Sequence, residues 1–236
     1  MAMGRASGGG LGGTGAASHR GVLLPLMLGG FMGLLNTGML TIALSTIGES
    51  FEVSVDVLIW LVTVYSLVVS LAMPLYGALG DALGLKACLL AGLSIFTAGS
   101  LIGGFARSFE AVLAARLVQA SGISAMSPSA MAIIARVFPS EQRGWAVGMY
   151  NASLPAATLV GPLLGGAVAQ YGSWNHIFLI NVPLGLLAVG LASRLVPRLE
   201  KRGASGFDIL GAFLFTAGLG TAQLPLATSG RAGPGW

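Results

Sequence analysis

The chain has 236 residues, of which 55% are hydrophobic and only 8% are charged. A soluble domain has about 25% charged residues, so this composition excludes a soluble globular protein and indicates a membrane protein. The net charge of +4 does not indicate a nucleic-acid-binding surface, because the basic residues stand between long apolar runs. The single cysteine, Cys88, excludes an intrachain disulfide.

The chain begins with a segment rich in glycine, alanine and serine, and residues 1–20 are expected to form a flexible cytoplasmic tail. The first apolar run, 21–47, contains no charged residue. It is longer than the roughly 7–15 apolar residues of a cleaved signal peptide. This run is therefore predicted to be a membrane-spanning helix.

Seven apolar stretches reach the length of about 20 residues that a helix needs to cross a bilayer. The first six are predicted to form a six-helix bundle over residues 21–193, followed by a cytoplasmic linker at 194–208. A seventh transmembrane helix is expected at 209–229, and residues 230–236 are then a truncated outer end. The predicted spans are 21–47, 57–79, 87–106, 111–135, 144–170, 175–193 and 209–229.

The distribution of charge predicts the orientation, because short cytoplasmic loops carry more lysine and arginine than outer loops. If the amino terminus is cytoplasmic, only Arg107 and Arg231 lie outside, and Arg116 lies within the fourth span. The first outer loop, GESFEVSVD, is acidic and has no basic residue. The inner segments then hold Arg5, Arg20, Lys86, Arg136, Arg143, Arg194, Arg198, Lys201 and Arg202.

A set of seven spans is also typical of retinal proteins and receptors. The seventh predicted span has no lysine that could form a retinal Schiff base. A receptor would need the opposite orientation, whereas the charges place the amino terminus inside and Trp236 outside. Both alternatives are therefore disfavoured.

The segment YGALGDALGLKA, residues 76–87, stands between the second and third predicted spans. It is not a dinucleotide-binding loop, because its glycine spacing differs from G-x-G-x-x-G and both neighbours are membrane helices. It resembles the G-x-x-x-D-x-x-G-R-K cytoplasmic loop of the major facilitator superfamily of transporters. The matching residues are Gly77, Asp81, Gly84 and Lys86, whereas Ala82 and Leu85 replace arginines that are usual in this loop.

Further segments match the same superfamily, in the same order along the chain. In the fourth span, RLVQASG resembles R-x-x-Q-G-x-G through Arg116, Gln119 and Gly122. WNHIFLINVPLG at the sixth span and FDILGAFL at the seventh resemble the fourteen-span drug:proton antiporter branch, and the resemblance covers residues 21–236. In the fifth span, VGPLLGG matches the antiporter signature G-P-x-x-G-G through Gly161, Pro162, Gly165 and Gly166.

The resemblance implies an all-α transmembrane fold, with an amino-terminal six-helix bundle of two inverted three-helix repeats and one further helix. It also implies that Arg116 and Gln119 belong to a proton-coupling network that is reached from a central cavity. The residue types leave an alternative, because an arginine near a span end can instead snorkel to the membrane surface. The fifth-span motif implies a bent, closely packed helix that limits leakage through the cavity.

Polar residues in the first span are candidates for the same network. Asn36 stands where relatives in this branch commonly have an aspartate, and an asparagine carries no proton at physiological pH. Proton coupling through the first span is therefore in question. Thr37, Thr41 and Ser45 recur every four residues, which predicts either a cavity-lining stripe or hydrogen bonds between helices.

The glycine-rich loop has its own expected roles. The resemblance implies a cytoplasmic latch that holds one conformation of the transporter. Asp81 is expected to cap the following helix or to interact with a helix dipole. Gly77 and Gly84 are expected to let neighbouring helices approach closely.

The sequence thus predicts membrane transport rather than enzymatic catalysis, with no metal site and no cofactor beyond a proton gradient. The expected location is the plasma (inner) membrane, and the expected partners are the lipid bilayer and a small-molecule substrate, with no nucleic acid. A missing carboxy-terminal bundle or a second chain is expected to complete the transporter. Small and apolar cavity residues suit hydrophobic or cationic drugs, although no acid in the spans remains to pair a cation.

Three functional hypotheses follow. The chain is the amino-terminal part of a proton-coupled efflux transporter that exports drugs or other small molecules by alternating access. It is alternatively a half that pairs with itself or with a separate second bundle. The third possibility is a truncated or half-size membrane protein that does not transport.

Overall fold

The computed structural model describes residues 14–199, which form seven helices. The predicted seventh span at 209–229, the outer end at 230–236, the linker beyond residue 199 and the first part of the tail lie outside the described residues. The helices are α1 (Thr14–Phe51), α2 (Val55–Leu83), α3 (Leu85–Gly104), α4 (Phe109–Val137), α5 (Ser140–Tyr171), α6 (His176–Leu179) and α7 (Asn181–Leu195).

Most of the predicted spans within this part of the chain correspond to helices that are long and apolar enough to cross a membrane. α5 has sufficient length at 32 residues, but it is less apolar than the other spans. α6 and α7 follow one another almost without interruption, because Ile180 between them keeps helical backbone angles (φ −57°, ψ −34°). α1 begins at Thr14, inside the segment expected to be a flexible tail. The five qualifying stretches are Arg20–Phe51, Val55–Leu83, Leu85–Gly104, Phe109–Val137 and His176–Leu195.

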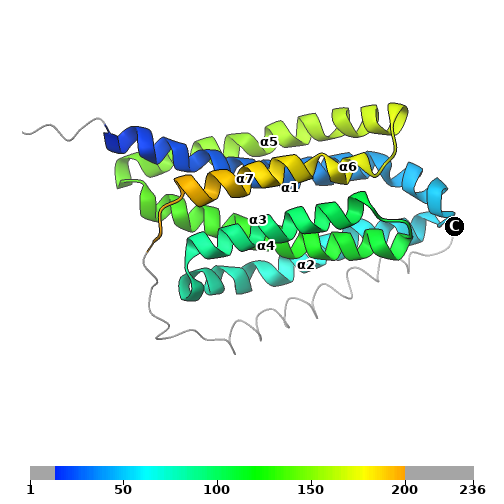
Figure 1. Cartoon of the computed structure of the whole chain (residues 1–236), viewed down its shortest axis with the longest axis horizontal. Helices are drawn as coiled ribbons and strands as arrows, with labels where there is room; N and C mark the ends of the chain where they lie inside the picture. The colour runs from blue at the N-terminus through cyan, green and yellow to red at the C-terminus, as the bar shows by residue number, and fades with distance from the viewer. Residues whose placement is uncertain (1–13, 200–236) are drawn as a thin grey trace, which may run out of the picture.

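The long helices alternate in direction and form two repeats with the same arrangement (Figure 1). α1 packs along α5, and α4 packs along α2. α3 packs against α4, α7 packs against α1, and α3 and α7 pack against each other. If α1, α2 and α3 are exchanged with α4, α5 and α7, respectively, this set of contacts is unchanged. This arrangement confirms the expected bundle of inverted three-helix repeats.

The buried apolar side chains form two clusters, which follow one another along the bundle. Along α1, the first cluster extends to Met32 and the second begins at Leu35. Asn36 comes directly after this transition and is fully buried. The polar residues described below therefore lie between the two clusters rather than at a membrane surface.

The closest helix contact joins α3 and α4, and it depends on glycine. A Cβ atom added at Gly122 would lie 2.5 Å from the backbone nitrogen of Phe96, and one at Gly99 would lie 2.8 Å from that of Gln119. Small residues allow such approach between membrane helices, where lipid removes most of the hydrophobic drive for association. This contact helps to position α4, which carries the principal candidate residues.

The segment expected to be a loop between the second and third spans is almost entirely helical. α2 continues through Leu83, α3 begins at Leu85, and only Gly84 lies between them. Its backbone angles (φ 103°, ψ 132°) belong to a region that glycine adopts without a steric penalty. The prediction of a long loop was wrong, because glycine and alanine within an apolar helix do not by themselves end it.

Candidate functional site

Arg116 of α4 lies in the interior of the bundle, and three helices contribute its contacts. Its Nη1 donates hydrogen bonds to Oδ1 of Asn36 in α1 at 2.5 Å and to Oε1 of Gln119 at 3.1 Å. Its Nε donates to the carbonyl oxygen of Leu61 in α2 at 3.4 Å. The guanidinium carbon also lies 3.9 Å from the ring centroid of Tyr65. The structure thus brings together the predicted residues Arg116, Gln119 and Asn36.

The alternative interpretation of Arg116, snorkelling to the membrane surface, was wrong. The side chain has no exposed surface and is the largest of the fully buried side chains in the described part of the chain. An arginine inside a membrane usually faces a partner or a cavity, because its transfer to the bilayer centre costs about 2.5–3.5 kcal/mol on insertion scales. The interior position of Arg116 fits this rule.

The buried charge of Arg116 is surrounded by neutral groups. No carboxylate is among its hydrogen-bond partners in the described chain. Gln119 extends the network to α3, since its Nε2 donates to Oγ of Ser100 at 2.8 Å. Two neighbouring donors, Nη2 of Arg116 and Nδ2 of Asn36, are buried and have no hydrogen-bond partner among the described residues. Such unsatisfied donors are costly, so a rearrangement that supplied an acceptor or a negative charge here would be favoured.

A cavity of about 280 Å³ opens beside this network and is bounded by α1, α2, α4 and α5. Tyr65 links the two features, because its ring contacts Arg116 and it also lines the cavity. The polar side chains of the lining carry hydroxyl groups, and none of the described lining residues carries a charge. The side chains that supply these hydroxyls are Thr37, Tyr65, Ser66, Ser127 and Tyr150.

The hydroxyl stripe of α1 is only partly a cavity wall. Thr37 lines the cavity, and its Oγ1 donates to the carbonyl of Gly33 one turn earlier in the same helix. The Thr41 hydroxyl likewise donates a hydrogen bond within α1, to the carbonyl of Thr37. Thr41 and Ser45 are both exposed. The hydrogen bonds that the Thr37 and Thr41 hydroxyls donate therefore stay within α1. The cavity interpretation applies to Thr37.

The fifth-span motif forms a direct backbone contact between α5 and α1. A Cβ atom at Gly161 would lie 3.1 Å from Cα of Gly38, and one at Gly165 would lie 2.9 Å from Cα of Met39. A Cβ atom at Gly166 would meet nothing within 4 Å. Two of the three glycines in the motif therefore serve close packing. α5 continues as one helix through Pro162.

This difference within one motif gives a matched pair of substitutions. Gly165→Val is expected to destabilise the protein by about 1–3 kcal/mol, because the new side chain collides with the α1 backbone. Gly166→Val adds the same side chain where nothing lies within 4 Å, so its effect is expected to be small. Thermal unfolding of the detergent-solubilised protein measures both. Equal losses in the two variants would contradict the assigned contact.

The residues of the expected latch connect the ends of neighbouring helices. Asp81, near the end of α2, forms an ion pair with Arg136 in the last turn of α4. Lys86, in the first turn of α3, donates from Nζ to the carbonyl of Ser193 near the end of α7 at 2.7 Å. The expectation that Asp81 caps the next helix was wrong, because Gly84 occupies the cap position and no side chain caps α3.

The two latch glycines also differ from each other. A Cβ atom at Gly77 would lie 3.9 Å from Pro128, an ordinary contact, so the expected close helix approach at Gly77 was wrong. Gly84→Ala is expected to cost about 1–3 kcal/mol, because alanine is strained at φ 103°. Gly77→Ala is expected to be neutral or slightly stabilising within α2. Chemical or thermal unfolding distinguishes these outcomes, and a tolerant Gly84 would contradict its role as the turn.

Comparison with known proteins places this geometry in a family. The family model of the Major Facilitator Superfamily matches residues 26–228. The chain is 33% identical to the riboflavin transporter RibZ of Clostridioides difficile (strain 630) over 198 residues, which cover 83% of the chain and 43% of RibZ. It is also 33% identical to the multidrug resistance protein Stp of Mycobacterium tuberculosis (strain CDC 1551 / Oshkosh), covering 84% of the chain and 37% of Stp.

A solved structure shows the same fold. The human organic anion transporter MFSD10 (TETRAN) superposes with a TM-score of 0.69 at 20% identity, over 86% of this chain and 54% of MFSD10. The matched region covers less than half the length of RibZ and of Stp. The bundle with its inverted repeats, the family-model match and these relatives agree, and the chain belongs to the major facilitator superfamily.

Proposed function

We propose that this chain supplies the amino-terminal bundle of a proton-coupled efflux transporter that exports drugs or other small molecules by alternating access. The observation that carries the proposal is Arg116, a fully buried charge that contacts three helices and shares Tyr65 with a cavity. A transporter needs such a connection, because binding in the cavity and charge movement in the network must affect one conformational equilibrium. The relatives' names, which mention riboflavin and multidrug resistance, support small organic substrates.

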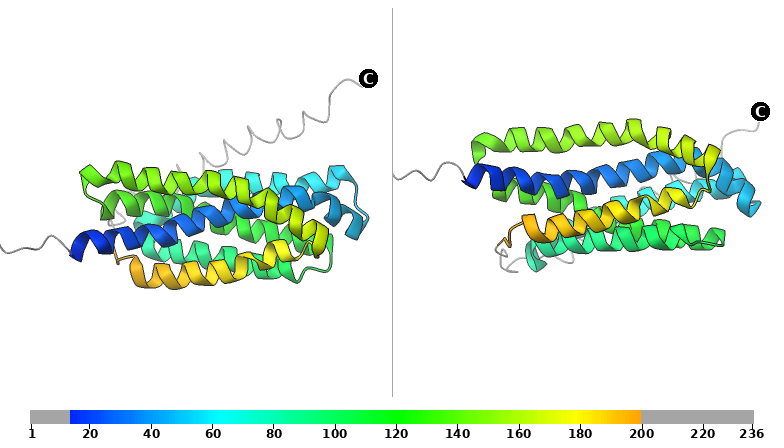
Figure 2. Two further views of the ribbon diagram at one scale, coloured as in Figure 1. Left: turned by 90° about the horizontal axis from the view of Figure 1, so that it is seen from above. Right: turned by 45° about the horizontal axis from the view of Figure 1, so that its top comes forward.

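The proposed orientation places the amino terminus in the cytoplasm of a cell with a plasma (inner) membrane. Charges at the two ends of the described bundle support it, because positive residues favour the cytoplasmic side. The α1 start and the α7 end lie at the same end of the molecule (Figure 2). That end carries Arg20, Lys86, Arg136, Arg143, Arg194 and Arg198, with Asp81 and Glu141, whereas the opposite end carries Glu49, Glu52, Asp56 and Glu110, with Arg107.

A second bundle of similar size is proposed to complete the substrate cavity, either on the same polypeptide or on another chain. Alternating access moves two bundles about a site between them, and the described helices supply one wall of that site. RibZ and Stp are more than twice as long as their matched parts, which supports this requirement. The bundle by itself is then expected to insert into the membrane without transporting.

The proposed substrate is an aromatic compound with hydrogen-bonding groups. Tyr65 and Tyr150 offer ring surfaces, and hydroxyl groups supply both donors and acceptors. None of the described residues that line the cavity is an acid that would pair a cationic drug. Uncharged compounds are therefore expected to bind better to this wall than permanent cations of the same size.

The test is uptake into everted membrane vesicles that contain the full gene product, with riboflavin as an uncharged probe and ethidium as a cationic one. Uptake that an inside-acid gradient drives and a protonophore abolishes would support proton-coupled efflux. Uptake unaffected by the protonophore would favour facilitated transport without coupling, which the neutral Asn36 beside Arg116 would explain. No uptake of either probe by a correctly inserted protein would contradict the proposed substrate class.

A further inference from the structure

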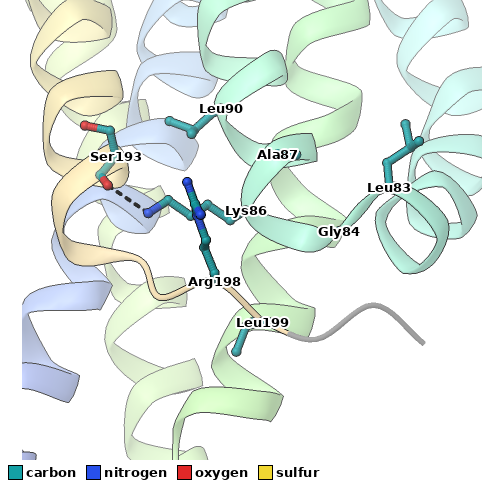
Figure 3. A pocket seen from close by; sticks show the side chains of 8 residues that line it. All are labelled: Leu83, Gly84, Lys86, Ala87, Leu90, Ser193, Arg198 and Leu199. Carbon is teal, nitrogen blue, oxygen red and sulfur yellow. Dashed lines mark hydrogen bonds between the residues drawn. The ribbon is translucent and has the colours of Figure 1, made fainter. Parts of the chain in front are cut away.

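A second cavity, of about 500 Å³, lies at the end of the bundle where α3 begins and α7 ends (Figure 3). It is separate from the cavity beside Arg116, since the two share no lining residue. None of the proposed transport steps uses it. Its lining residues are Leu83, Gly84, Lys86, Ala87, Leu90, Ser193, Arg198 and Leu199.

The charge of this cavity is positive. Lys86 enters it from α3 and Arg198 from the segment after α7, and none of the described residues that line it is acidic. Figure 3 shows the two basic side chains lying toward the same space. One hydrogen of the Lys86 ammonium is donated to the carbonyl of Ser193, so two others remain for a ligand. The Arg198 guanidinium is exposed, and its planar fork suits the oxygens of a phosphate.

The remaining lining of the cavity is apolar. Leu83, Leu90 and Leu199 contribute aliphatic side chains beside the two cations. Free inorganic phosphate would gain nothing from these leucines. An amphiphile with a phosphate next to hydrocarbon uses both parts of the lining, and phospholipids have that structure. The cavity also lies at the basic end of the bundle, at the ends of membrane-spanning helices.

We propose that this cavity binds an anionic phospholipid. Lys86 and Arg198 contact the headgroup phosphate, and the leucines contact the first carbons of an acyl chain. Basic pockets between membrane helices at the cytoplasmic side are suited to such headgroups, because charge attraction and apolar contact act together. The bound lipid bridges the start of α3 and the end of α7, which already share the hydrogen bond from Lys86 to Ser193.

The test is native mass spectrometry of the purified protein with phosphatidylglycerol or phosphatidylcholine of identical acyl chains. Phosphatidylglycerol is expected to be retained in preference to phosphatidylcholine. Arg198→Gln is expected to lower its retention about fivefold, in line with the contribution of one basic residue near an anionic lipid surface. Arg194→Gln is the matched control, because Arg194 is an exposed arginine at the same end of α7 that does not line the cavity.

Three further outcomes decide the proposal. Arg198→Lys keeps the charge and is expected to keep most of the preference, which separates lipid binding from a loss of fold. Equal losses in the Arg194 and Arg198 variants would overturn the proposal, since they would show a diffuse surface attraction rather than a site. Displacement of phosphatidylglycerol by millimolar inorganic phosphate would also overturn it, because the acyl contacts would then contribute nothing.

Discussion

Replacing Arg116 by alanine is expected to abolish proton-coupled transport while the protein still inserts into the membrane. Insertion is expected to be retained because the substitution causes two opposing changes in free energy of similar size. The variant avoids burying a charge, which costs about 2.5–3.5 kcal/mol. It also leaves the acceptor oxygens of Asn36 and Gln119 without their donor, at about 1–3 kcal/mol for each unsatisfied group. Gradient-driven uptake in vesicles, together with the amount of protein in the membrane, measures both effects.

Two control variants define what the Arg116 result means. Arg116→Lys keeps the charge, but the lysine ammonium cannot contact Asn36, Gln119 and the Leu61 carbonyl at the same time. Partial activity is therefore expected. Arg107→Ala removes an exposed arginine that precedes α4 at the acidic end of the bundle, and its transport is expected to remain normal. Unimpaired transport by Arg116→Ala would show that the buried network is structural only.

Replacing Asn36 by aspartate is expected to make transport depend more steeply on the proton gradient. The amide oxygen of Asn36 lies 2.5 Å from Nη1 of Arg116, so the introduced carboxylate would form a buried ion pair there. Such a pair holds α1 and α4 together when ionised and releases them when protonated, whereas asparagine holds one state at all pH values. Uptake rates over a series of external pH values, at constant membrane potential, measure the change.

The control for this prediction removes the acceptor without adding a charge. Asn36→Leu leaves Arg116 with one fewer partner and is expected to lower stability by about 1–3 kcal/mol without adding pH dependence. Thr37→Val changes the neighbouring residue, which faces the cavity, and is expected to leave the pH profile unchanged. An identical pH profile for wild type and Asn36→Asp would contradict the coupling role of this position.

The sequence was sufficient to predict most of the spans within the described residues and the identity of the polar residues, but not their contacts. Arg116 and Asn36 are 80 positions apart, and no pattern in either span shows that they touch. Tyr65 was missed for a related reason. It stands in a run of apolar residues, where an aromatic ring is as suitable for lipid or packing as for a cavity, and only the fold places it beside Arg116.

The incorrect predictions for the connection between α2 and α3 have a similar physical origin. Glycine and aspartate are typical of turns, yet α2 continues through both because its backbone bonds are satisfied within the helix. Asp81 was expected to act locally, but its partner Arg136 lies 55 positions further along the chain. Among the glycines, the sequence does not distinguish Gly165, which packs against α1, from Gly166, where an added Cβ would meet nothing within 4 Å. That distinction depends on the rotation of α5 about its own axis.

The contacts of Arg116 have a consequence for how the protein is made. Asn36, Leu61 and Ser100 all precede Arg116 in the chain, and Gln119 follows it within one turn. Because synthesis proceeds from the amino terminus, the described groups that hydrogen-bond to Arg116 all exist before the fourth helix is complete. Arg116 can therefore leave the translocation machinery directly into a polar environment that the first three helices provide. Among the described residues, no helix after α4 forms a hydrogen bond with Arg116, so α4 is expected to insert correctly without contacts from α5.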